Sequence, residues 1–249
     1  MEKGTRRGQA VASSLRIRKH AGAARPEERP WHPLPRSFYA TGSISLAQRL
    51  IGQKLVHVLD DGIRLAGIIV ETEAYLGVKD RAAHSFGGRR TDRNEAMYAQ
   101  AGTSYVYFTY GMHFCMNVVC GKVGEPVAVL IRALEPVEGI EVMRANRARK
   151  PRKGALRDQD LCSGPGRLCE ALGIRRRLNG IDLAQSPELF IEPGKNYGPR
   201  ALVRTTRIGI ASAQEWATRP LRWYLKGNEH VSVRAPGDRS AQAQRTNAL

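Results

Sequence analysis

The sequence predicts an α+β fold in which helices surround one mostly antiparallel β-sheet. Two hairpin signals, each a tight turn between β-forming runs, are typical of antiparallel pairing. Helical segments occur without the regular βαβ alternation of parallel sheets, and no internal repeat is present. The chain has 249 residues, of which 42% are hydrophobic and 25% charged, enough apolar material for a sizeable core.

Helices are expected at three places. Leu46, Leu50 and Ile51 share one face of a short helix that Gly52 ends. Pro136 suits the first position of a longer helix, because its missing N–H would be unpaired there in any case. The predicted helices cover residues 43–52, 136–149 and about 165–172.

Strands are expected where β-branched and aromatic residues run between turn residues. Asp60-Asp61-Gly62 joins the first two strands, and Gly111 lies between the two strands of a second hairpin. The predicted strands cover residues 54–59, 64–71, 104–110, 114–119, 127–133, 206–210, 222–225 and 231–233.

The charge of the chain is strongly basic. Lys and Arg number 40 and Asp and Glu 23, a formal net charge of +17 at pH 7. Residues 1–30 carry +5 and residues 234–249 carry +2, so +10 remains on residues 31–233. A basic folded surface favours a protein that binds a polyanion, first nucleic acid and second an anionic membrane. The alternative is a soluble, highly charged protein without such a partner. We expect residues 1–30 to be a flexible basic arm and residues 235–249 a disordered tail.

Several classes of protein are excluded. No run reaches the roughly 18 apolar residues that span a bilayer, and the N-terminus lacks a secretory hydrophobic segment. Cys115, Cys120, Cys162 and Cys169 do not have the spacing of common zinc sites, and no phosphate-binding or dinucleotide-binding glycine motif is present. We expect no metal and no cofactor, and cysteines that are reduced and buried.

The segment Gly67–Tyr75 is the most informative part of the sequence. Alternate residues of an extended strand share a face, which places Glu71, Glu73 and Tyr75 together with Ile69. Two carboxylates beside an aromatic ring would suit general-base chemistry, although a solvated strand face with two ordinary Glu residues is the more common structure. Arg132 ends an apolar strand, where an unpaired charge is costly, so we expect Glu73 or Glu71 as its partner.

Two further segments have residues that suit nucleic acid. Tyr105, Tyr107 and Tyr110 crowd into six residues, and an exposed aromatic ring can stack on a base or wedge into a duplex. Core packing is the more common role of strand aromatics. Residues 81–93 form an Arg-rich loop with two glycines, and the D-x-x-E signal at residues 92–95 predicts that a helix begins there. This loop is a candidate phosphate site or a mobile surface loop.

Five strings, taken in order, closely resemble the alkyladenine (3-methyladenine) DNA glycosylase family of the mammalian type. The strings are V-E-T-E-A-Y-L-G (70–77), A-A-H-S-F-G-G-R-R-T (82–91), Y-V-Y-F-T-Y-G-M-H-F-C-M-N (105–117), L-I-R-A-L-E-P (130–136) and L-C-S-G-P (161–165). The resemblance implies one glycosylase domain, residues 31–234, with a curved antiparallel sheet similar to the C-terminal domain of formyltransferases acting on methionyl-tRNA. It also implies base-excision repair, by hydrolysis of the bond between a damaged purine and deoxyribose.

The resemblance implies a catalytic role for two of the matched residues. Glu73 would be the general base that activates a water against the anomeric carbon, and Arg132 would help to place that water. The base that is flipped out of the duplex would be bound by Tyr75, His84, Tyr107 and, on the pocket floor, Asn117, whose side chain would clash with the amino group of normal guanine.

The resemblance also implies contacts to double-stranded DNA that contains damaged purines. Tyr110 would be the wedge that fills the gap left by the flipped base. Supporting DNA contacts would come from Met112, Arg89, Thr91 and Arg147. The protein would act as a monomer, away from membranes and inside the cell with the DNA, in a bacterial nucleoid or a nucleus.

The sequence departs from the mammalian members at three places. His113 stands where they have Tyr, Arg167 stands where they have Lys, and the segment between Asn117 and Arg132 is two residues longer. These differences bear on DNA contacts and lesion range. A catalytically silent module that binds damaged DNA or structured RNA is the alternative function; a hydrolase of free nucleosides is disfavoured, because a neutral substrate gains little from a basic surface.

Overall fold

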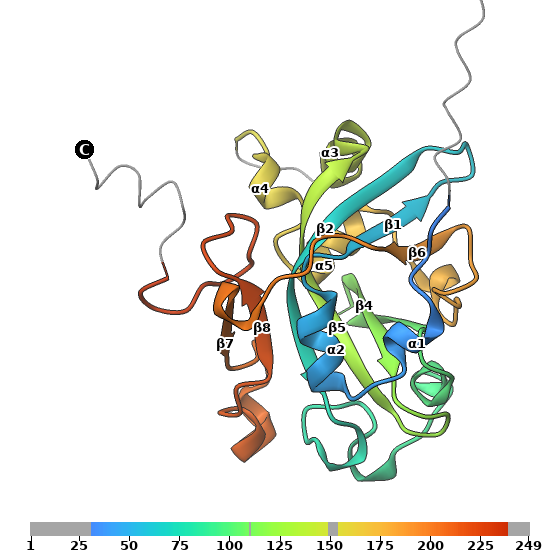
Figure 1. Ribbon diagram of the computed structural model, residues 1–249, viewed down its shortest axis with the longest axis vertical. Helices are drawn as coiled ribbons and strands as arrows, with labels where there is room; N and C mark the ends of the chain where they lie inside the picture. Colours follow the sequence, from blue (N-terminus) through green and yellow to red (C-terminus); the bar gives the residue numbers. More distant parts are fainter. Residues whose placement is uncertain (1–30, 110, 149–153, 239–249) are drawn as a thin grey trace, which may run out of the picture. The chain divides into compact units, whose positions relative to one another are not determined.

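Eight antiparallel strands form one curled sheet in the computed structural model, which describes residues 31–109, 111–148 and 154–238 (Figure 1). The strand order is β3-β4-β5-β2-β1-β6, with β8 paired to β2 and β7 paired to β8. The predicted α+β class with a mostly antiparallel sheet is confirmed. The strands are β1 (Lys54–Val58), β2 (Arg64–Tyr75), β3 (Ser104–Thr109), β4 (His113–Cys120), β5 (Val127–Glu138), β6 (Leu189–Glu192), β7 (Leu202–Thr205) and β8 (Arg222–Leu225).

Short helices accompany the sheet. The α-helices are α1 (Arg36–Tyr39), α2 (Ser43–Leu50), α3 (Ile140–Ala148), α4 (Asp158–Leu161) and α5 (Pro165–Ala171). The 3-10 helices are η1 (Gly77–Lys79), η2 (Phe86–Gly88), η3 (Glu95–Tyr98), η4 (Arg176–Leu178), η5 (Pro199–Ala201) and η6 (Ala211–Trp216). Helices α2 and α5 confirm two of the predicted ones. Within the described residues, no helix has both the length and the apolar character that crossing a membrane requires.

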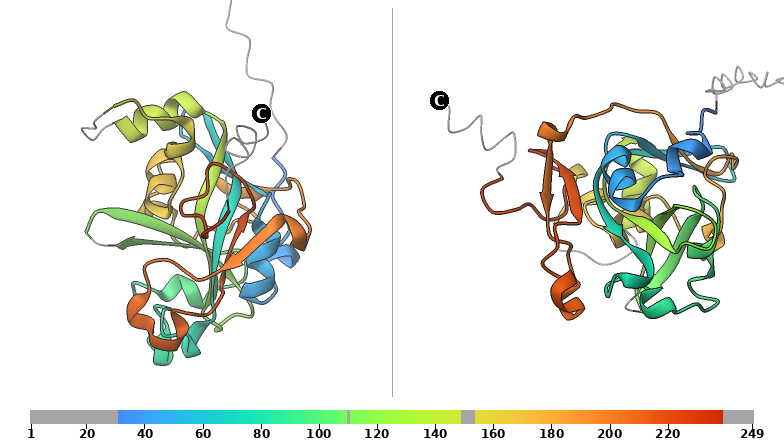
Figure 2. Two further views of the ribbon diagram at one scale, coloured as in Figure 1. Left: turned by 90° about the vertical axis from the view of Figure 1, so that its left-hand side faces the viewer. Right: turned by 60° about the horizontal axis from the view of Figure 1, so that its bottom comes forward.

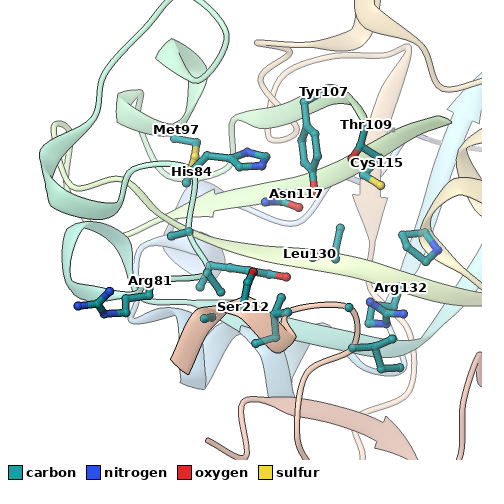
Figure 3. A pocket seen from close by; sticks show the side chains of 18 residues that line it. Arg81, His84, Met97, Tyr107, Thr109, Cys115, Asn117, Leu130, Arg132 and Ser212 are labelled. Carbon is teal, nitrogen blue, oxygen red and sulfur yellow. The ribbon is translucent and has the colours of Figure 1, made fainter. Parts of the chain in front are cut away.

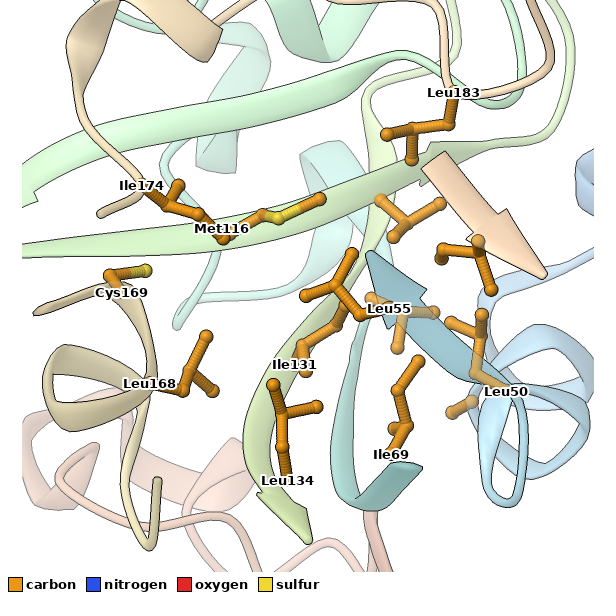
Figure 4. Packing of buried hydrophobic residues seen from close by; sticks show 14 of the residues in the cluster. Leu50, Leu55, Ile69, Met116, Ile131, Leu134, Leu168, Cys169, Ile174 and Leu183 are labelled. Carbon is orange, nitrogen blue, oxygen red and sulfur yellow. The ribbon is translucent and has the colours of Figure 1, made fainter. Parts of the chain in front are cut away.

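The main hydrophobic core lies where α2 and α5 pack against one face of the sheet (Figure 4). Leu50 of α2, Ile69 of β2 and Leu168 of α5 are among its fully buried side chains. Ile131 and Leu134 of β5 complete its centre. Burial of one such side chain contributes about 1.5–3 kcal/mol relative to exposure, so this face of the sheet is firmly anchored.

A break in the register of β2 changes which residues share a face. The pairing with β5 shifts between Ile69 and Glu71, and an extra residue at such a bulge reverses the alternation that follows. Ile69 and Ala74 therefore both belong to the main core, whereas Val70 packs on another cluster. The prediction that Ile69 shares a face with the two glutamates is wrong, because it assumed an unbroken strand.

The predicted helix at residues 136–149 begins too early. Strand β5 continues through Pro136, which lies opposite Gly67 at a second irregularity of the register. Because proline has no N–H to donate to the ladder, irregular positions of this kind accept it. The chain turns at Gly139, whose φ of 70° is in the left-handed region, and α3 follows.

Two predicted strands near the C-terminus do not form. Residues 206–210 follow β7 instead of belonging to it, and residues 231–233 are irregular. In both segments a backbone N–H is given to a buried carboxylate: Ile208 donates to Glu73 at 2.8 Å, and Ser232 to Glu71 at 2.8 Å. The pattern of apolar residues did not reveal this use of the backbone, and it did not reveal β6 at residues 189–192.

We predict that Gly139→Ala destabilises the protein by about 2–4 kcal/mol, because a Cβ is disfavoured at its positive φ and also meets packed atoms. The added Cβ would lie 2.4 Å from Leu65 Cδ2 and 2.6 Å from the Arg64 carbonyl oxygen. Gly62→Ala is the control: its φ is 83° but nothing lies within 4 Å, so we expect a loss of only about 1–2 kcal/mol. Urea denaturation measures both, and equal losses would contradict the steric part of the argument.

Candidate active site

A cavity of about 390 Å³ opens on the face of the sheet opposite the main core (Figure 3). Its walls come mainly from strands β2 to β5 and from two segments, residues 81–84 and 208–213. In Figure 3, His84, Tyr107 and Asn117 lie toward one side of the cavity and Arg132 toward the other. The structure thus brings together residues that are far apart in the sequence.

Glu73 lies directly behind the wall of this cavity. The side chain has no exposed surface, and both carboxylate oxygens have partners. Oε1 accepts from the Ile208 N–H at 2.8 Å and lies 3.1 Å from Arg132 Nη1, while Oε2 accepts from the Tyr75 hydroxyl at 2.9 Å. All three partners line the cavity, so a small molecule bound there is separated from Glu73 only by the groups that hold the carboxylate.

Arg132 connects Glu73 to a second buried carboxylate. Its Nε donates to Glu71 Oε1 at 3.1 Å, and Arg222 Nη1 donates to the same oxygen at 2.7 Å. The prediction that Arg132 pairs with a glutamate is confirmed, and both candidates are its partners. Burial lowers the pKa of Arg132, but Glu73 and Glu71 more than reverse this effect and raise it. The guanidinium group therefore stays charged beside the cavity.

Aromatic rings form much of the cavity wall. His84 Nδ1 is 2.8 Å from the Tyr105 hydroxyl, and the His84 ring meets Tyr107 edge to face at 4.6 Å between centroids. Tyr105 and Tyr107 are stacked at 5.0 Å. Burial and then the charge of Glu73 raise the pKa of Tyr75 well above its usual value, so this hydroxyl stays protonated and donates to Glu73. Of the residues expected to bind a base, Tyr75, His84, Tyr107 and Asn117 all line the cavity.

Asn117 is 5% exposed, and its side-chain oxygen has no hydrogen-bond partner in the described part of the chain. A buried amide oxygen without a partner is costly. The side chain lines the cavity, although the oxygen itself has almost no exposed surface, so the amide is a buried polar group in the cavity wall. The structure therefore gives this cavity a polar group that can discriminate between ligands.

The residues expected to contact DNA are in three different settings. Arg89 and Thr91 border a second hollow of about 340 Å³, which shares the loop at residues 81–84 with the main cavity. Met112 is 64% exposed at the β3–β4 hairpin, which projects from the sheet (Figure 2). Arg147 is buried and paired with Glu170, and Tyr110 lies outside the described residues.

The loop before η3 does not have the capping structure that its sequence predicts. The predicted D-x-x-E cap is absent: η3 has no side-chain cap, and Glu95 instead pairs with Arg90. Asn94 organises the loop, since its Oδ1 accepts from the Thr91 N–H at 2.7 Å. The basic side chains of this loop therefore do not lie at the N-terminus of an α-helix. Their guanidinium groups can act as hydrogen-bond donors at this surface.

The described residues contain no group of three or more His, Cys, Asp or Glu side chains placed to hold a metal. All four cysteines are buried and unpaired, as the sequence predicts. Burial raises the pKa of Cys115, which lines the cavity, to about 11. This thiol is therefore protonated near neutral pH, and it contributes polarity but no charge.

Two residues of the site were missed by the sequence prediction. Arg207 and Asp80 form a fully buried pair, with Nη1–Oδ2 and Nη2–Oδ1 distances of 2.6 and 2.9 Å. The pair joins the loop after β2 to the segment that carries the Ile208 N–H. No spacing in the sequence links two residues 127 positions apart, so only the fold reveals the pair.

The site combines a buried carboxylate, an arginine in the cavity wall and three aromatic side chains that line the cavity, a combination typical of sites for small organic ligands. The comparison with known sequences agrees with this class. The chain belongs to the methylpurine-DNA glycosylase family, whose sequence pattern matches residues 37–229. The resemblance drawn from the five strings is thereby confirmed.

Similar proteins occur in mammals and bacteria. DNA-3-methyladenine glycosylase of Mus musculus is 46% identical over 219 residues, 86% of this chain and 62% of that protein. The Homo sapiens protein of the same name is 47% identical over 201 residues, 79% of this chain and 66% of that protein. A putative 3-methyladenine DNA glycosylase of Clostridium acetobutylicum is 48% identical over 202 residues, 80% of this chain and 97% of that protein. The chain thus spans under two thirds of the mammalian relatives and nearly all of the bacterial one.

We predict that His84 is neutral at physiological pH and gains a proton only near pH 4. Partial desolvation, then the charges of Arg93 and Arg89, lower its pKa to about 4, because nearby cations disfavour the imidazolium form. Arg93→Gln should therefore move the midpoint upward toward 6.5, as followed by NMR titration of the imidazole. Arg90→Gln, which removes an exposed cation paired with Glu95, should leave it unchanged; a midpoint near 6.5 in the unsubstituted protein would contradict the prediction.

Proposed function

We propose that the protein is a monofunctional DNA glycosylase, a hydrolase that cleaves the N-glycosidic bond of damaged purines in double-stranded DNA. The observation that carries the proposal is Glu73, held by Arg132 directly behind an aromatic cavity of about 390 Å³, a size within the range of small-molecule sites. The names of the mammalian and bacterial relatives support the same reaction. Its lesions would be alkylated and deaminated purines: 3-methyladenine, hypoxanthine and ethenoadenine.

A base inside a duplex cannot reach this cavity, so it is flipped out of the helix at a cost of a few kcal/mol. Stacking on aromatic rings contributes about 1–3 kcal/mol per base, and Tyr75, His84 and Tyr107 supply the rings. A cationic alkylated purine is attracted more strongly to such rings than a neutral one. Tyr110 would insert into the gap left in the duplex and offset part of the lost stacking.

In the chemical step, a water molecule from the cavity takes a place beside Glu73 among the groups that now cover the carboxylate. Glu73 then removes a proton from this water as the water bonds to the anomeric carbon. The bond from this carbon to the purine nitrogen breaks, and the purine leaves with the electron pair. Arg132 points its guanidinium group at Glu73 Oε1, where it orients the carboxylate and the water.

The described residues that line the cavity include no Lys, so no amine is available for a Schiff base and a strand-cleaving step is not expected.

Selection against normal guanine would rest on Asn117. Its side chain lies in the cavity wall and is nearly buried, so it has little freedom to move aside. The amino group of guanine would clash with this side chain, whereas adenine-derived lesions and hypoxanthine have no group at that position. Alkylation also makes the purine a better leaving group, so a damaged base reacts with less assistance than a normal one.

The DNA duplex would lie against the basic surface around the cavity. Arg89, Arg93 and Thr91 border the adjoining hollow, where guanidinium groups can pair with phosphate oxygens. Met112 at the exposed hairpin would contact the duplex beside the wedge residue. We infer that the protein binds DNA as a monomer and is found with the DNA inside the cell.

We predict that Glu73→Gln binds lesion duplexes but excises the base about 10²–10⁴-fold more slowly, because the amide cannot accept the proton. The test is single-turnover release of hypoxanthine from a duplex with enzyme in excess, scored by alkaline cleavage at the abasic site. Glu95→Gln is the matched control, since this carboxylate is exposed and pairs only with Arg90 among the described contacts. Full activity of Glu73→Gln would remove the proposed base.

We predict that Arg89→Ala weakens binding to lesion and undamaged duplexes alike, because it removes a phosphate contact and not a contact to the base. The slope of the logarithm of affinity against the logarithm of salt concentration should fall by about 0.9. Fluorescence anisotropy across a salt series measures both quantities. An unchanged slope would place Arg89 outside the DNA interface.

A further inference from the structure

Among the aromatic side chains of the cavity wall that the structure describes, Tyr75 has a buried arginine against its ring. The Arg207 guanidinium carbon lies 4.7 Å from the centre of the Tyr75 ring. The Arg207 side chain has no exposed surface, so it covers one face of the ring from inside the protein. Because Tyr75 also lines the cavity, only its other face and its edge are open to a bound base.

The charge of Arg207 is balanced by Asp80. Asp80 accepts two hydrogen bonds from this guanidinium group and two more from the N–H groups of Leu76 and Ala82, each at 3.0 Å. Arg207 also donates to the Ala74 carbonyl at 3.0 Å. Three backbone contacts therefore hold the pair in place, with the guanidinium group of Arg207 against the ring.

We propose that the balance of charge between Arg207 and Asp80 affects the preference of the site between cationic and neutral purine lesions, acting across the Tyr75 ring. This inference rests on the function proposed above. A base stacked on the free face of Tyr75 would lie about 3.5 Å beyond the ring, roughly 8 Å from the guanidinium carbon on the opposite side. At that distance, inside a protein, a guanidinium charge that lacks its carboxylate repels a cationic base appreciably and leaves a neutral base almost unaffected.

The electrostatics predict opposite effects for the two members of the pair. Asp80→Asn leaves Arg207 charged, since a guanidinium group does not lose its proton in proteins, so the uncompensated cation opposes a cationic lesion. Arg207→Met removes that cation, so a cationic lesion gains relative to a neutral one. A loss of structure would instead lower the rates for both lesions and would not change their ratio in opposite directions.

The experiment measures the ratio of kcat/KM for 3-methyladenine to kcat/KM for hypoxanthine, in duplexes of the same sequence, for four forms of the full chain. Relative to the unsubstituted protein, the ratio should fall about tenfold in Asp80→Asn and rise about threefold in Arg207→Met. It should return to within about threefold in the double variant, from which both charges are gone. The ratio cancels any difference in the folded fraction, because each preparation is tested on both lesions.

Two further variants test whether the effect depends on the charge at residue 207 and on the location of the ion pair beside the cavity. Arg207→Lys keeps the cation, so its ratio should stay within about twofold even if both rates fall. Asp182→Asn makes the same substitution in an ion pair with Arg36 whose members do not line the cavity, and its ratio should not change. Ratios that stay constant throughout, or that move in the same direction in both single variants, would overturn the proposal. Failure of the unsubstituted protein to release either base would instead refute the proposed function.

Discussion

Two buried carboxylates and two buried guanidinium groups form the interaction on which the site depends. Glu71 forms ion pairs with Arg132 and Arg222, and Arg132 also forms an ion pair with Glu73. Removal of one member of such a buried set leaves an uncompensated charge and costs about 3–5 kcal/mol. The observed register of β2, β5 and β8, which carry these side chains, is therefore favoured over registers that would separate the charges.

The bulge in β2 makes this arrangement compatible with a hydrophobic core on the other face of the sheet. Before the bulge, Ile69 faces the core; after it, Ala74 does. Glu73 and Tyr75 are thereby directed to the cavity while the strand continues to bury apolar side chains against α2. A strand with unbroken alternation would place Ile69 on the same face as Glu73, and either the core or the site would lose a residue. Bulges are often found beside active sites for this reason.

The sequence predicts the local parts of this structure well and its long-range parts poorly. Turn chemistry and alternation are local, so both hairpins, α2 and the strand that carries Glu73 follow from the residues. The pairing of Arg132 with a glutamate follows from the cost of an unpaired charge. The bulge and the role of the Ile208 N–H depend on which strands meet, and the pair of Asp80 with Arg207 spans 127 positions. The five strings indicate which residues surround the cavity, but not that Glu73 is fully enclosed by its partners.

The buried charges around the cavity are balanced, whereas the excess of positive charge lies in other parts of the chain. The buried groups around the cavity balance: Glu71, Glu73 and Asp80 face Arg132, Arg207 and Arg222. The excess of +17 therefore lies elsewhere in the chain, including Arg89 and Arg93 at the neighbouring hollow. A basic surface attracts a polyanion over a distance of about a Debye length, roughly 8–10 Å in physiological salt. On the function proposed above, an uncompensated excess of buried positive charge beside the cavity would repel a cationic purine. Balanced buried charges together with a basic surface would then allow the protein to attract the phosphates of DNA and still accept a positively charged base.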